Sequence, residues 1–123
     1  MTPVDLAAEL DRLSHLIDQG IAALREQSVA LAQAESDYRK AKAEAWVTCP
    51  RDADPKDREW TAGRREAWVD AHTADLRYVR DLAEGTRQAA LEAVRARRVQ
   101  LSAAMTLVAA HRSEADLARV DQR

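Results

Sequence analysis

Roughly the first 45 residues carry apolar side chains at intervals of seven, and this repeat limits the possible folds more than any other feature. One series consists of Leu10, Ile17, Leu24, Leu31, Tyr38 and Ala45. A second series consists of Leu6, Leu13, Gly20, Gln27, Ala34 and Ala41, of which Gln27 alone is polar. An apolar period of 3.5 residues is typical of a helix that lies along a partner helix. The sequence therefore predicts one long helix that buries a narrow seam.

Two helix starts share one pattern. Thr2-Pro3-Val4-Asp5 places an oxygen at the N-cap, proline at the first helical position and a carboxylate at the third, and Asp54-Pro55-Lys56-Asp57 repeats this order. Between them, Pro50 predicts the end of the first helix, because the residue before a proline avoids the α region. We therefore expect a single domain of residues 1–123, with helices over about 3–47 and 55–118 and a loop over about 48–54.

The second predicted helix contains Gly85, and glycine is the residue in it that could interrupt the helix. A lone glycine costs about 1 kcal/mol relative to alanine and rarely ends a helix that strong helix formers flank. The sequence therefore predicts an all-α fold, a long antiparallel helical hairpin of coiled-coil type whose second helix is the longer one. A break at Gly85 would instead give a three-helix bundle.

The second helix has two apolar stripes, so we expect it to contact more than one neighbour. The stronger stripe consists of Trp60, Ala67, Trp68, Ala71, Ala74, Tyr78, Leu82, Ala89, Ala93, Ala96, Ala103, Leu107 and Ala110. The weaker stripe consists of Val69, Leu76, Val94, Leu101 and Val108.

A short loop would place residues opposite each other when their numbers add to roughly 102. Gly20 would then receive Leu82, and Gly85 would receive Ile17. The first helix would run out opposite about residue 99, which leaves the apolar segment after it without a partner in the chain. We expect this segment to form an interface with a second copy or another protein through Leu101, Met105, Leu107 and Val108.

Arginines of the second helix form a candidate nucleic-acid face, namely Arg80, Arg87, Arg95 and Arg98. Acidic residues dilute this stripe, and the chain as a whole has a net charge of -2. A solvated face with local ion pairs is therefore the favoured interpretation, and binding to nucleic acid is the alternative.

Three tryptophans gather near the predicted loop and form a candidate aromatic anchor for a partner: Trp46, Trp60 and Trp68. The favoured interpretation is packing at the end of the hairpin, since tryptophan is common in both settings.

No spacing in the chain predicts an active site or a metal centre. His15, His72 and His111 lie far apart, and the chain has 3 glycines, too few for a phosphate-binding loop. We therefore expect a protein that is not an enzyme and has no cofactor.

The chain also lacks an apolar run long enough for a membrane span, and its one cysteine, Cys49, fits a reduced compartment, so we expect a cytoplasmic location.

Three segments carry a resemblance to a known group of proteins: YRKAKAEAWV at 38–47, TADLRYVRDLAEG at 73–85 and RRVQLSAAMTLVAAHR at 97–112. Together they resemble small helical proteins that actinobacterial phages encode among early genes for recombination or replication. The resemblance covers about two thirds of the chain and implies a phage origin without any catalytic residue. Our prediction is a helical interaction or adaptor protein that self-associates and binds a protein partner. The alternative is an accessory factor for DNA recombination or replication.

Overall fold

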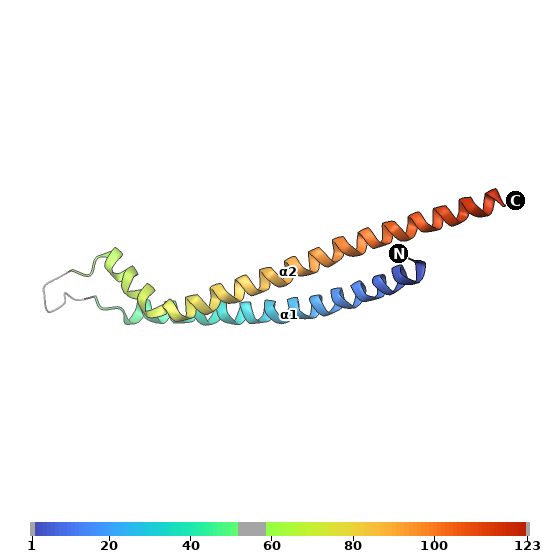
Figure 1. Cartoon of the computed structure of the whole chain (residues 1–123). Helices are drawn as coiled ribbons and strands as arrows, with labels where there is room; N and C mark the ends of the chain where they lie inside the picture. Colours follow the sequence, from blue (N-terminus) through green and yellow to red (C-terminus); the bar gives the residue numbers. More distant parts are fainter. Residues whose placement is uncertain (1, 52–58, 123) are drawn as a thin grey trace. The chain divides into compact units, whose positions relative to one another are not determined.

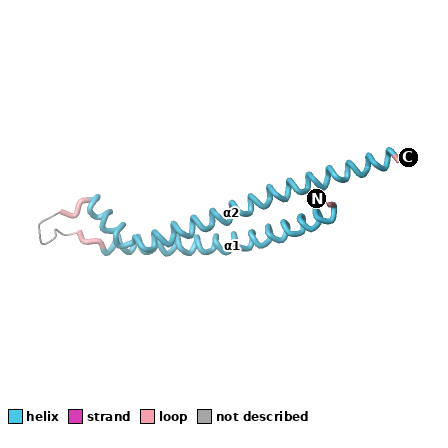
Figure 2. Tube along the Cα trace, in the orientation of Figure 1, coloured by secondary structure: helices cyan, strands magenta, loops and turns pink. Residues whose placement is uncertain are grey.

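The described residues form two long helices. The computed structural model describes residues 2–51 and 59–122, in which α1 spans Pro3–Thr48 and α2 spans Ala62–Asp121 (Figure 1). Neither described range contains a strand (Figure 2). The predicted all-α helical hairpin is confirmed, and α2, with 60 residues, is longer than α1, with 46. Gly85 lies inside α2, so the alternative of a three-helix bundle is wrong.

The start of α1 is held by the N-cap that the sequence predicts. The backbone amide of Asp5 donates to Thr2 Oγ1 at 3.1 Å, while the backbone amide of Thr2 donates to Asp5 Oδ2 at 3.0 Å. The Thr2 hydroxyl also donates to Asp5 Oδ2 at 2.7 Å, and this bond does most to hold the pKa of Asp5 below its usual value. Free amides of the first turn are therefore satisfied within the helix.

The start of α2 differs from the prediction. The expected cap at Asp54-Pro55 lies outside the described residues, and Glu59, Trp60 and Thr61 are not helical. Instead, the backbone amide of Arg64 donates to Thr61 Oγ1 at 3.2 Å, so Thr61 is the N-cap of a helix that begins at Ala62. The helix ends at Asp121, against an expected end near 118.

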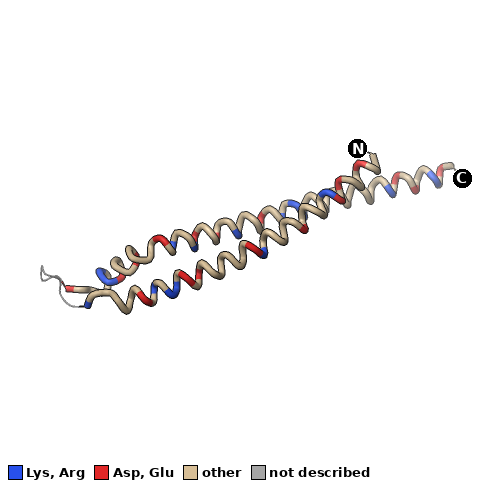
Figure 3. The backbone as a smooth tube through the Cα atoms, turned by 90° about the horizontal axis from the view of Figure 1, so that it is seen from below, with Lys and Arg blue, Asp and Glu red and all other residues tan. Residues whose placement is uncertain are grey.

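Segments of the two helices form two units, each an antiparallel pair. One unit contains Met1–Arg25 and Gln88–Arg123, and the other contains Glu26–Arg87. All positions of both heptad series in α1 are buried or half-buried, which confirms the predicted seam. Charged residues of both signs occur along both helices outside this seam (Figure 3).

The face of α2 that packs against α1, here called the inner seam, follows the same heptad spacing. Its buried and half-buried members are Val69, Thr73, Leu76, Arg80, Ala83, Arg87, Ala90, Val94, Arg97, Leu101, Ala104, Val108 and His111. The weaker of the two predicted stripes therefore belongs to the core. Most of the alanine-rich stripe is exposed, because valine and leucine bury more apolar area than alanine does.

The register of the helix pair also differs from the prediction. In the first unit, a Cβ atom on Gly20 would lie 2.9 Å from Val94 Cγ2, and in the second unit, Ala45 and Val69 share a core cluster. The numbers of opposed residues thus add to about 114 rather than 102, because α2 begins later than expected. Gly20 receives Val94 and not Leu82, while Gly85 has nothing within 4 Å of an added Cβ.

This register corrects the expectation that the chain leaves everything after Val99 without a partner. Ala104 is buried, and Leu101 and Val108 are half-buried. They belong to the unit that also contains the start of α1. With the observed register, α1 begins opposite about residue 111, so the part of α2 that outruns it is shorter than the sequence suggested.

Alanine at the two glycines gives a test of the register. Gly85→Ala should raise the free energy of unfolding by about 1 kcal/mol, because alanine favours the helix and the site is open. Gly20→Ala gains the same propensity but places its Cβ against Val94, which costs about 1–3 kcal/mol, so it should give no gain or a loss. Urea unfolding followed by circular dichroism at one protein concentration measures both. Equal gains at the two positions would contradict the register.

Candidate functional site

The four residues predicted to form an interface do not share one face. Leu101 and Val108 belong to the inner seam and are half-buried. Met105 and Leu107 are exposed by 57% and 51%. The structure therefore separates the predicted set into two core residues and two residues available to a partner. A charged residue in place of Leu101 would disturb packing within the chain, so a loss of assembly in such a variant could not be assigned to the interface alone.

A second heptad face lies on α2 within the unit Met1–Arg25 and Gln88–Arg123, and it is exposed throughout. We call it the outer seam. Its members are Ala96, Val99, Ala103, Thr106, Ala110, Ser113, Leu117 and Val120. Val99, Leu117 and Val120 are exposed by 70%, 65% and 66%. The members alternate at intervals of three and four, which is the spacing that lets one helix pack along another.

The outer seam has a chemistry suited to close helix packing. Its members are small or apolar, and residues 99–110 of α2 contain no charged side chain. Small side chains allow two helix axes to approach, while Val99, Leu117 and Val120 supply the apolar area. The inner seam on the same helix already packs against α1, so the outer seam would serve a further helix.

Large apolar side chains are also exposed on the α2 segment of the other unit. Tyr78 and Leu82 are exposed by 68% and 58%, and both belong to the alanine-rich stripe. Tyrosine combines a large contact area with a polar group, and it is common where proteins meet. This surface is the second candidate for a partner.

The candidate aromatic anchor packs within its own unit. Trp46, Trp60 and Trp68 are partly buried against the cluster of Ala45, Cys49 and Val69. The Arg64 guanidinium lies 3.9 Å from the ring centre of Trp60, and the Arg65 guanidinium lies 5.5 Å from the ring centre of Trp46. The ring of His72 stacks on the ring of Trp68, with 3.7 Å between the ring centres. These contacts agree with packing at the end of the hairpin, and a role in binding stays a prediction.

Two of the four arginines of the candidate nucleic-acid face, Arg80 and Arg87, belong to the inner seam. Arg80 lies 4.7 Å from the ring centre of Tyr38, and its Nη2 lies 2.7 Å from Asp81 Oδ1. The hydrogen bond to Asp81 is the main reason that the pKa of Arg80 rises above its usual value. Arg87 Nε donates to Ser28 Oγ at 3.2 Å.

Arg95 and Arg98, by contrast, are exposed. The four arginines therefore do not form one phosphate-binding surface. Arg80 and Arg87 are seven residues apart at heptad positions shared with Val94, and this spacing could have revealed their place in the core.

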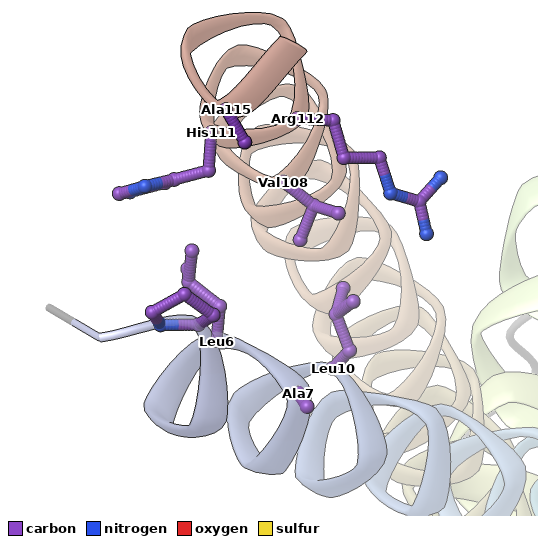
Figure 4. Close-up of a pocket in the computed structure, with 8 residues that line it drawn as sticks. Leu6, Ala7, Leu10, Val108, His111, Arg112 and Ala115 are labelled. Carbon is purple, nitrogen blue, oxygen red and sulfur yellow. The ribbon is translucent and has the colours of Figure 1, made fainter. Parts of the chain in front are cut away.

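A crevice of about 380 Å³ lies between the start of α1 and α2. Leu6 and Leu10 face Val108 across it, and His111 and Arg112 extend to either side of Val108 (Figure 4). All of these residues belong to the unit Met1–Arg25 and Gln88–Arg123. Sequence reasoning missed the crevice, because it depends on the observed register.

Neither a metal centre nor a membrane span emerges from the described part of the chain. Residues 2–51 and 59–122 bring together no group of three histidine, cysteine or acidic residues that could hold a metal ion. Within the same ranges, no helix has the length and apolar character needed to cross a bilayer.

Comparisons with protein-family models, with curated proteins and with solved structures give no match to this chain. The resemblance to phage proteins therefore stays a prediction.

Replacing one arginine of each kind tests the division of the arginine stripe. Arg80→Ala removes a guanidinium that lies over the buried Tyr38 ring, so the urea midpoint of unfolding should fall. Arg77→Ala, at an exposed position of the same helix and the same unit, is the matched control and should leave the midpoint close to that of the unchanged protein. The account of the inner seam would be wrong if both substitutions had the same small effect.

Proposed function

We propose that this chain is a non-enzymatic helical interaction protein that self-associates through the outer seam of α2. The observation that carries the proposal is a second, exposed heptad face on a helix whose first heptad face already packs within the chain. In a single chain this face leaves large apolar side chains in contact with water, which is unfavourable. Exposed apolar faces of this kind mark sites of protein interaction.

The apolar area of the outer seam is sufficient to support association. Full burial of a valine or leucine side chain contributes about 1.5–3 kcal/mol, and each of two copies would contribute Val99, Leu117 and Val120. Association costs about 4–15 kcal/mol in lost freedom of motion. The gain is therefore of the size needed for a complex at micromolar concentration.

The exposed Tyr78 and Leu82 give the proposal its second part, a surface for a different protein. Tyrosine is enriched among the residues that carry most of the binding energy in protein interfaces, and the leucine beside it adds apolar area. A chain that self-associates through one segment of α2 and holds a partner on another would act as an adaptor.

The proposal includes a cytoplasmic location, which rests on the single cysteine of the sequence. An accessory role in phage DNA recombination or replication stays the alternative. It finds less support in the geometry, because Arg80 and Arg87 contact α1 residues of their own unit.

Sedimentation at micromolar concentration tests self-association. The unchanged protein should have the mass of a dimer or a larger assembly. Ala103→Glu should give a monomer with unchanged helix content, because it places a charge in the middle of the outer seam, and glutamate is a strong helix former. Ala22→Glu, at an exposed alanine of α1 in the same unit, should leave the mass as it was. A monomer for the unchanged protein across the micromolar range would rule out the proposal.

A further inference from the structure

We infer that two copies of the chain pair antiparallel through the outer seam, about a two-fold axis near residue 105. The inference rests on the proposed self-association and adds the partner, the orientation and the register. The evidence comes from the charges and side-chain sizes along residues 92–121 of α2, which all belong to one unit.

The two ends of the outer seam carry opposite charge. On the amino-terminal side of the uncharged segment 99–110 lie Arg95 and Arg98, both exposed and without an ion pair among the described residues. On its carboxyl-terminal side lie the exposed carboxylates of Glu114, Asp116 and Asp121. A parallel pair would set like charges beside each other at both ends. An antiparallel pair sets the basic end of each helix beside the acidic end of the other.

The remaining charges of the segment do not reverse this pattern. Arg97 belongs to the inner seam and donates to Gln100 Oε1 at 3.1 Å. Arg119 Nη1 lies 3.8 Å from Asp116 Oδ1, but both side chains are strongly exposed, so this pair is weak. Glu92 accepts a hydrogen bond from Gln88 Nε2 at 3.2 Å. Arg112 is exposed and extends beside Val108 at the crevice (Figure 4). With it counted, residues 92–98 carry three basic and one acidic side chain, and residues 111–122 carry three acidic and two basic ones, so the two ends keep opposite net charge.

The register follows from the heptad. Opposed members of the outer seam have numbers that add to about 209, which places the alanine at 103 opposite Thr106 of the second copy. Ala110 then lies opposite the second copy's Val99. In the uncharged middle of the seam, Val99 therefore meets an alanine, as close packing requires. Arg95 comes within reach of the second copy's Asp116, both being next to outer-seam positions.

A second copy fits this surface because the segment is complementary to itself. Rotation about a two-fold axis exchanges the basic end with the acidic end and maps the uncharged middle onto itself. An unrelated helix would need its own charge pattern to match, whereas a second copy supplies both halves without any further element.

Disulfide cross-linking in a Cys49→Ser background tests the orientation, because Cys49 is the one cysteine of the chain. An antiparallel pair should cross-link a mixture of Ala96→Cys and Ser113→Cys variants, and neither variant alone. A parallel pair would cross-link each variant with itself. Thr106→Cys lies next to the expected axis, so it should cross-link in either orientation and serves as the control for association through the seam.

The outcomes separate the two claims. Cross-linking of Thr106→Cys together with self-cross-linking of Ala96→Cys would overturn the antiparallel inference and leave the proposed self-association intact. No cross-linking at Thr106 in a protein that sediments as a dimer would mean that another surface is used, and it would overturn both claims. A protein that sediments as a monomer would remove both as well.

Charge reversal provides a second measurement. Arg95→Glu with Arg98→Glu should raise the dimer dissociation constant about tenfold, because it replaces attraction by repulsion at both ends of the seam. Adding Glu114→Arg and Asp116→Arg to the same chain should restore the original constant. In a parallel pair like charges face each other before and after each change, so the dissociation constant should change little at either step.

Discussion

The packing of the inner seam of α2 against α1 is the constraint on which the other features depend. Val94 fits against Gly20, where no side chain intervenes, and Ala45 meets Val69 near the other end of the helices. Helices that interlock at heptad intervals can in principle slide by seven residues, so contacts between particular large and small side chains decide which residues face each other. Polar contacts add to this choice, since the Arg80 guanidinium lies over the Tyr38 ring and Arg87 donates to Ser28.

This register determines which surfaces remain for a partner. It buries Leu101, Ala104 and Val108 partly or fully within the chain, and it turns Val99, Ala103 and Ala110 outward. The exposed residues keep a heptad spacing of their own. A helix with two such faces resembles a member of a larger bundle more than one half of an isolated pair, and this is the physical basis for proposing self-association.

The sequence was sufficient for the helices and for the seam of α1, because the heptad and the Thr2-Pro3 cap are local signals. It was insufficient for the register, because that depends on where α2 begins. Asp54-Pro55 matches the sequence pattern of a helix start more fully than Thr61 does, yet the N-cap in the described residues is Thr61. The inner seam is the stripe of α2 with fewer apolar residues. Arg80, Arg87 and Arg97 occupy core positions there, so a simple count of apolar residues ranked the stripes in the wrong order.

The central claim is that the outer seam is covered when the protein is folded at working concentration. If folding and association are linked, mass action requires the thermal midpoint to rise with protein concentration. Calorimetry over about a hundredfold range of concentration measures this directly, because a lone folded chain has a midpoint independent of concentration. The account predicts a steady rise of the midpoint across the range. A constant midpoint would contradict it.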